Sequence, residues 1–238
     1  MVKAIKAFFQ SGHMLKSLNH TIISLIPKVE LPTDLKQYRP ISLCNVLDKV
    51  ISKILANRLK PILELCISKN QSSFIPNRQI LDNIIISHEC LHFLKNKRQG
   101  NDGYTALKLD MSKAYDRVEW GYLKAVMEKM GFNQVWVEWI MECISSVSNS
   151  FNVNGEAKKY VIPARGIRQG DPLSPYLFLL CSEGLSSVLK NATRQGSISG
   201  LRISKHGLAI THLFFADDML IFCKAVGAET RKLREILD

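Results

Sequence analysis

Hydrophobic and polar positions along the chain predict a succession of interleaved helices and strands. Residues 19–27 form a short apolar run that ends at Pro27, which is typical of a strand. Residues 47–59 repeat apolar side chains at helical spacing, and Pro61 ends or kinks that helix. A second helix is expected from about 79 to 95. No dinucleotide-binding fingerprint accompanies this order, so we expect an α+β fold with an antiparallel sheet backed by helices.

The second half of the chain contains a strand, a helix start and a hairpin. Apolar and polar residues alternate before Asp110, which predicts a strand that this residue closes. Ser174 and the proline after it suit the N-cap and first position of a long helix. Residues 210–223 read as an apolar run, two acids and another apolar run, which predicts a β-hairpin with Asp217 and Asp218 at its tip.

These three acids are the candidate catalytic residues. Adjacent carboxylates repel one another and lose hydration on folding, so cations are expected to neutralise them. Hard divalent ions with oxygen ligands, above all Mg²⁺, suit such a group. Acid clusters that hold two ions about 3.5–4 Å apart drive phosphoryl displacement in polymerases and nucleases. A local explanation stays open for Asp217 and Asp218, because Asp also tolerates turn geometry.

Charge is unevenly distributed. The net charge is +11, and residues 1–104 carry 15 basic and 7 acidic side chains, a net +8. Such an excess favours a polyanionic partner, nucleic acid before membrane. A basic surface that merely keeps the protein soluble is the alternative.

Cysteine usage and hydropathy bear on the compartment. The six cysteines contain no C-x-x-C pair and mostly have apolar neighbours, so we expect buried, reduced thiols in an intracellular protein, in the nucleus or the cytoplasm. No run approaches the roughly 18–20 apolar residues that span a bilayer, so no membrane partner is expected. The first residues, with Ile5, Phe8 and Phe9, suit a short amphipathic helix that docks on the domain.

Residues 165–175, RGIRQGDPLSP, form a second candidate site. The two glycines permit close backbone approach, and Arg165 and Arg168 are expected to supply charge facing a phosphate. Gln169 both donates and accepts hydrogen bonds. An ordinary Gly-Pro turn with solvated arginines is the alternative.

A rival motif lies on the second predicted helix. His88, Glu89 and His92 match H-E-x-x-H, which places two histidines one turn apart and suits a zinc protease. No convincing third ligand follows. Surface histidines on a packed helix are the other interpretation.

Six segments in order resemble one known family. NHTIISLIPK, YRPISLCNVLDKVISKILANRLKPIL, QSSFIPNRQILDNI, LKLDMSKAYDRVEW, RGIRQGDPLSPYLF and FFADD together resemble the reverse transcriptase domain of plant LINE-type non-LTR retrotransposons, over essentially the whole chain. The resemblance implies a right-hand polymerase fold with fingers at 1–104 and a palm at 105–238. It also implies a return to the fingers around 150–170. Compared with the family pattern, we expect the thumb to be absent and the endonuclease segment to be missing.

The resemblance also implies roles for individual residues. Asp110, Asp217 and Asp218 match the catalytic acids that bind two Mg²⁺ ions, with Mn²⁺ as a substitute. The residues implied to contact the nucleotide are Arg39 at the triphosphate, Tyr115 as the ring that excludes a 2′-hydroxyl, and Gln169 with Gly170 beside the incoming nucleotide and template.

The implied function is RNA-directed DNA polymerisation, with an RNA template, a DNA primer and dNTPs as partners. A catalytically inactive remnant that at most binds nucleic acid is the alternative. The sequence departs from the family pattern at three positions. Asp48 stands where an aromatic residue is usual, Asn77 where glycine is usual, and Asn152 where an apolar strand residue is usual.

Overall fold

The computed structural model describes residues 1–98, 103–204 and 207–238. They form two compact units, each built from two separate segments. The first unit contains residues 1–61 and 113–178, and the second contains 62–112 and 179–238. The chain therefore passes between the units three times.

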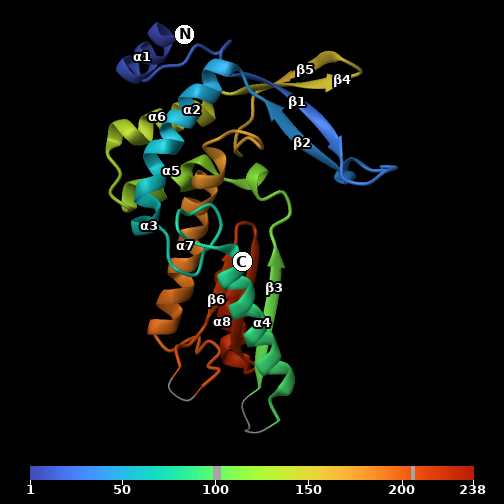
Figure 1. Ribbon diagram of the computed structural model, residues 1–238, viewed down its shortest axis with the longest axis vertical. Coiled ribbons are helices and arrows are strands. Elements are labelled where there is room, and N and C mark those ends of the chain that lie inside the picture. The colour runs from blue at the N-terminus through green and yellow to red at the C-terminus, as the bar shows by residue number, and fades with distance from the viewer. Residues whose placement is uncertain (99–102, 205–206) are drawn as a thin grey trace. The chain divides into compact units, whose positions relative to one another are not determined.

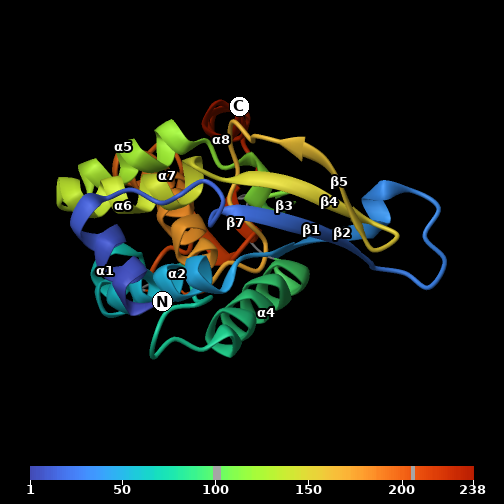
Figure 2. The ribbon, with the colours of Figure 1, turned by 90° about the horizontal axis from the view of Figure 1, so that it is seen from above.

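The first unit has a four-stranded sheet in the order β2-β1-β4-β5, in which only β1 and β4 run parallel (Figure 2). The pairing of β4 with β1 joins two segments more than a hundred residues apart. The elements of this unit are α1 Val2–Ser11, β1 His20–Pro27, η1 Leu35–Gln37, β2 Tyr38–Leu43, α2 Val46–Leu59, η3 Tyr115–Arg117, α5 Trp120–Lys129, α6 Gln134–Ser145, β4 Ser148–Val153 and β5 Glu156–Val161. A 3₁₀ turn, η2 Lys60–Ile62, follows α2.

Local sequence explains several of these boundaries. Helix α2 begins where the Asn45 side chain accepts a hydrogen bond from the backbone N–H of Leu47, and it ends before Pro61. Strands β4 and β5 are joined at Asn154 and Gly155, whose φ angles of 53° and 86° suit the tight turn of a hairpin. The predicted end of this helix and the predicted turn are confirmed.

The second unit is built on a three-stranded antiparallel sheet in the order β3-β7-β6 (Figure 1). Its elements are α3 Leu63–Cys66, α4 Ile80–Asn96, β3 Tyr104–Asp110, β6 His212–Phe215, β7 Asp218–Lys224 and α8 Gly227–Leu237. Helix α7, Ser174–Arg194, begins in the first unit and continues into the second. The hairpin predicted at 210–223 is confirmed as β6 and β7.

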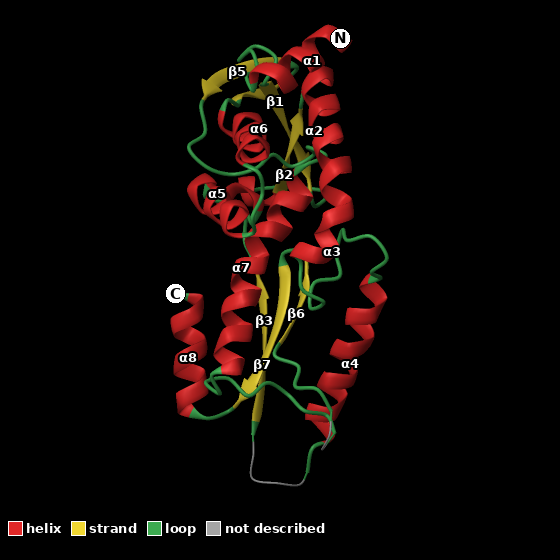
Figure 3. Cartoon of the chain, turned by 90° about the vertical axis from the view of Figure 1, so that its left-hand side faces the viewer, coloured by secondary structure: helices red, strands yellow, loops and turns green. Residues whose placement is uncertain are grey.

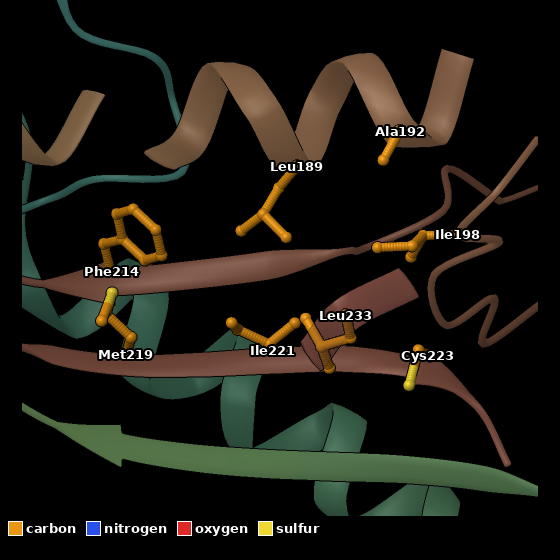
Figure 4. Packing of buried hydrophobic residues seen from close by; sticks show 8 residues of the cluster. All are labelled: Leu189, Ala192, Ile198, Phe214, Met219, Ile221, Cys223 and Leu233. Atoms are coloured by element: carbon orange, nitrogen blue, oxygen red, sulfur yellow. The ribbon is translucent and has the colours of Figure 1, made fainter. Parts of the chain in front are cut away.

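Alternating side chains give this sheet two buried faces. One face packs against α7 and α8, and Figure 4 shows its cluster: Leu189, Ala192, Ile198, Phe214, Met219, Ile221, Cys223 and Leu233. The other face packs against α4 through Cys90, Leu213 and Phe222. Figure 3 shows the strands between α4 on one side and α7 with α8 on the other. Two helical layers therefore hold the sheet rigidly, as a site at its edge requires.

The overall class is mixed α+β. Helix α1 buries Phe8, as its amphipathic pattern predicts. None of the helices in the described part of the chain combines the length and apolar character needed to cross a bilayer.

The central strand of the second unit should dominate its stability. Ile221 is fully buried, so Ile221→Ala should lower the free energy of unfolding by about 2–5 kcal/mol, through lost burial and the cavity left behind. Leu65 is 88% exposed, and Leu65→Ala should change it by about 0.5 kcal/mol or less. Urea titration of both variants measures the difference, and similar losses would contradict the placement of this core.

Candidate active site

The three predicted acids meet at one end of the sheet of the second unit. Asp110 is the last residue of β3, and the strand register places it directly opposite Asp218, the first residue of β7. Asp217 occupies the two-residue turn between β6 and β7, next to Ala216. Directly opposed residues have Cβ atoms about 4.5–5.5 Å apart. Two strand ends and a turn therefore present three carboxylates together.

These acids are open to solvent and carry little compensating charge. Asp110 and Asp217 are exposed, and the Asp218 side chain is half exposed. Lys108 Nζ lies 3.4 Å from Asp218 Oδ1, but the lysine side chain is 70% exposed, so this ion pair contributes little to stability. The peptide N–H of Met111 donates to the carbonyl of Asp217 over 3.4 Å, which ties the turn to the end of β3.

A second acidic group lies in the first unit. In the described part of the chain, the one set of three or more His, Cys, Asp or Glu ligand atoms within 4.8 Å of one another is Cys44, Asp48 and Asp171. The carboxylates of 110, 217 and 218 are more widely spaced than this. Spacing alone therefore favours the buried group as a metal site. The charged side chain beside it argues against this assignment.

The cation in this buried group is the guanidinium of Arg168. Its Nη2 lies 2.9 Å from Asp48 Oδ2 and 2.7 Å from Asp171 Oδ2, and all three side chains are almost fully buried. Burial alone would lower the pKa of Arg168, but Asp171 and Asp48 raise it by more, so the charge is kept. Burial raises the pKa of the Cys44 thiol to about 11, which leaves it a poor metal ligand. Arg168 is therefore already the cation that pairs with both carboxylates of this site.

The expectation that Arg168 faces a phosphate is therefore wrong. Its Nη1 donates to Asn19 Oδ1 at 2.8 Å and Thr21 Oγ1 at 3.1 Å, so the partners of these hydrogen bonds lie inside the unit. Arg165, in contrast, is 59% exposed and pairs with Glu119 at 2.9 Å. Spacing in the sequence could not distinguish these two arginines. The difference is that Arg168 has two buried acids as neighbours, which only the folded chain brings to it.

The loop at 165–171 is attached by its backbone to two other segments of the first unit. The N–H of Ile167 donates to the carbonyl of Tyr115 at 2.9 Å, and the N–H of Ser42 in β2 donates to the carbonyl of Gln169 at 2.9 Å. Gly170 has φ 104°, and a Cβ there would lie 3.3 Å from the Ser42 carbonyl oxygen. A side chain at this position would crowd the docking of the loop on β2.

The candidate nucleotide-binding residues therefore belong to one unit. Arg39 is exposed on β2, three residues before the contact of this strand with the loop. The ring of Tyr115 stacks on Phe178 with centroids 5.4 Å apart and planes 7° from parallel. Gln169 and Gly170 lie on the loop itself. The acids at 110, 217 and 218 belong to the other unit.

The rival zinc motif has no third ligand in the described residues. His88 and His92 lie exposed on α4. Neither belongs to the group of possible metal ligands in the described residues, which is Cys44, Asp48 and Asp171. His92 Nε2 lies 2.8 Å from Asn96 Nδ2, one turn further along the helix. Surface histidines on a packed helix account for this motif.

Sequence reasoning missed the polar residues that support the acid-bearing hairpin. Gln71 is buried, and its Oε1 accepts a hydrogen bond from the N–H of Ala216 in the turn. Asn83 on α4 donates to the carbonyls of Asn70 and Phe214. No local signal marks these residues, because their partners on the hairpin, Ala216 and Phe214, lie more than a hundred positions away.

A buried histidine on β6 was also missed. His212 Nε2 lies 2.9 Å from Ser186 Oγ, which lies 2.9 Å from Ser68 Oγ, and His212 Nδ1 lies 2.9 Å from Thr211 Oγ1. Burial, together with the nearby positive charge of Lys190, lowers the pKa of His212 to about 4. The ring is therefore neutral at physiological pH and links α7 to the hairpin.

Comparison with known proteins identifies the class. Residues 26–238 match the family described as reverse transcriptase (RNA-dependent DNA polymerase). The chain belongs to this family. The match covers β3, the β6–β7 hairpin and the loop at 165–171, so all the candidate site residues lie inside it.

Relatives of known name place the chain within the family. It is 28% identical over its whole length to the Pol polyprotein of the Drosophila melanogaster type-2 retrotransposable element R2DM, covering 21% of that protein. It is 29% identical over 90% of its length to the uncharacterized 149 kDa protein of transposon TX1 from Xenopus laevis, covering 16% of it. An uncharacterized mitochondrial protein of Arabidopsis thaliana is 53% identical over 68 residues, which is 29% of the chain and 56% of that relative.

These comparisons confirm the predicted class, a reverse transcriptase domain of the non-LTR retrotransposon type. The chain spans only a part of each relative. The plant origin stays a prediction.

Removal of the buried guanidinium should destabilise the first unit strongly. Arg168→Met leaves Asp48 and Asp171 buried without a counter-ion, and we expect a loss of about 3–5 kcal/mol. Arg165→Met breaks only an exposed pair, and the expected loss is about 1 kcal/mol or less. Equal shifts of the two variants in denaturant unfolding would contradict a buried ionic centre at Arg168.

Stability should fall in mild acid because of His212. The pKa of His212 is about 4 in the folded state and 6.5 for an ordinary histidine. Between these pH values the unfolded state therefore binds a proton that the folded state does not bind. The contribution of His212 to the free energy of unfolding is fully present above pH 6.5 and has fallen by about 3 kcal/mol at pH 4. Unfolding titrations of wild type and His212→Gln across this range should show a shallower slope for the variant. Parallel slopes would refute the assignment.

Proposed function

We propose that this chain is the core of an RNA-directed DNA polymerase of a non-LTR retrotransposon. One observation carries the proposal: the register of β3 with β7 sets Asp110 opposite Asp218, with Asp217 in the adjoining turn. In a chain of the reverse transcriptase family, this is the chemistry of a two-metal nucleotidyl transfer site.

The donor set suits divalent metal ions. The three carboxylates offer hard oxygen ligands at a solvent-open end of the sheet, and the one ion pair that they form in the described residues, Lys108 with Asp218, is exposed; this matches the preferences of Mg²⁺ or Mn²⁺. Asp110, Asp217 and Asp218 would hold two such ions. When bound, the ions supply activation of the primer 3′-hydroxyl and charge neutralisation at the phosphates. Lys108 would then release Asp218, because an exposed ion pair is weak.

The polymerase subdivisions follow from this assignment. We assign the second unit, with the acids, to the palm and the first unit to the fingers. The pairing of β4 with β1 supports a return of the chain to the fingers near 150–170. Arg39 would bind the triphosphate, Tyr115 would exclude a 2′-hydroxyl, and the Gln169–Gly170 segment would pack against the incoming nucleotide and template.

An RNA template, a DNA primer and dNTPs are the proposed partners. The net charge of +8 over residues 1–104 supports contact with phosphate backbones, and such binding should weaken steeply as salt rises. Cysteine thiols rather than disulfides support an intracellular place of action.

Primer extension tests the proposal. With an RNA template, a DNA primer, dNTPs and Mg²⁺, Asp217→Asn should reduce incorporation at least about a hundredfold, because one metal-binding charge is lost. The matched control is Glu235→Gln, which removes an exposed acid on α8 of the same unit and should leave the rate unchanged. Both proteins should bind RNA equally.

The inactive alternative predicts a different result. Salt-dependent RNA binding by the wild type without any incorporation would favour a remnant that only binds nucleic acid. Equal incorporation by wild type and Asp217→Asn would exclude these acids as the catalytic site.

A further inference from the structure

The turn that carries Asp217 has an unfavourable backbone conformation. Ala216, the first of its two residues, has φ 58°, in the left-handed region that residues with a Cβ rarely adopt. Such a conformation persists only when surrounding contacts hold it. The contacts of Ala216 therefore decide how the two acids that follow it are oriented.

We propose that Gln71 is the positioning residue for this turn, and through it for Asp217 and Asp218. The inference rests on the proposed polymerase function. Gln71 is 1% exposed, and its Oε1 accepts the N–H of Ala216 at 3.2 Å and the N–H of Ser73 at 3.0 Å. Because both partners are backbone donors, the side-chain amide must present its oxygen to them.

The backbone of Gln71 is itself fixed to β6. Gln71 forms a parallel bridge with Phe214, flanked by bonds from Phe214 N to the Asn70 carbonyl at 2.8 Å and from Ser72 N to the Phe214 carbonyl at 3.4 Å. Asn83 Nδ2 donates to the carbonyls of Asn70 and Phe214, at 2.9 and 3.1 Å. The amide that reaches Ala216 therefore extends from a rigid base.

Arg78 secures the same segment by its carbonyl groups. Its Nη1 donates to the carbonyls of Ser68 at 2.6 Å and Gln71 at 2.7 Å, and its Nη2 donates to that of Ile67 at 2.8 Å. One guanidinium thus fixes the turn that precedes Gln71. Fixing the backbone of this turn is what a role in orienting the hairpin requires.

The chemistry of Gln71 separates a positioning role from packing alone. Its Nε2 is buried and has no hydrogen-bond partner among the described residues. A buried unpaired donor costs stability, and an apolar residue of similar shape would avoid this cost. A glutamine at this position is therefore explained by its oxygen. On the other side of the turn, the bond from Met111 N to the Asp217 carbonyl is longer, at 3.4 Å.

Two substitutions isolate the acceptor. Gln71→Met keeps the approximate shape and removes the oxygen, whereas Gln71→Glu keeps an acceptor oxygen in the uncharged carboxylic acid that burial favours. Gln71→Asn, which is one methylene too short to reach Ala216, replaces the methionine variant if that protein does not fold. Ser182→Ala is the matched control, because it removes a buried hydrogen bond of the same unit, from Ser182 Oγ to the Leu179 carbonyl on α7, that touches neither the turn nor the segment of Gln71.

Amide hydrogen exchange gives a direct measurement that needs neither metal nor substrate. In Gln71→Met, exchange at Ala216 should accelerate about tenfold relative to Met219 and Ile221 of β7, because its hydrogen bond is lost. Gln71→Glu should stay near the wild-type rate. Ser182→Ala should change the exchange of β7 and of Ala216 in proportion.

Primer extension gives the functional measurement. Gln71→Met should lower kcat about tenfold or more and raise the Mn²⁺ concentration for half-maximal rate, while the KM for dNTP stays within about twofold. Gln71→Glu should recover most of kcat. Proportional acceleration at Ala216 and in β7, or equal kcat losses in Gln71→Glu and Gln71→Met, would overturn the proposal. If the wild type itself does not extend primers, the polymerase assignment fails while the exchange measurement still decides the role of Gln71.

Discussion

The register between β3 and β7 is the constraint on which the rest of the site depends. Leu107 and Leu109 face the cluster beneath α7 and α8, so the opposite face of β3 must carry Lys108 and Asp110. A slip of one residue would bury the acid and expose the leucines, which the core does not allow. Opposed like charges are unfavourable, and they are tolerable here because this end of the strand pair is exposed to solvent. Burial of apolar residues therefore decides where the acids lie.

In both units, buried polar contacts fix the conformation of loops and turns near candidate site residues. In the first unit, Arg168 joins the loop at 165–171 to α2 through Asp48. In the second unit, Gln71 and Asn83 tie the segment before α4 to β6 and its turn. Such contacts add little net stability compared with apolar packing, but removing one partner is costly. They therefore specify one loop conformation, which a site built from several segments requires.

The departures from the family pattern have physical partners in the structure. The carboxylate of Asp48 is paired with Arg168, so a charged residue is tolerated at a buried position. Asn77 has φ 61°, a conformation that asparagine adopts more readily than other residues with a Cβ. Asn152 is exposed and donates to Ser24 Oγ on β1 at 3.2 Å. None of these changes touches the three acids, and each fits its local backbone or charge.

The sequence by itself determined the elements that carry the acids, because strand alternation and turn residues are local signals. It predicted the end of β3 at Asp110, the β6–β7 hairpin and the helix that begins at Ser174. Only the tertiary structure decided that β7 lies between β3 and β6, that Arg168 is buried, and that Gln71 supports the turn. These features depend on contacts between segments more than a hundred residues apart, for which periodicity carries no information. The same reason explains why each compact unit combines two distant segments of the chain.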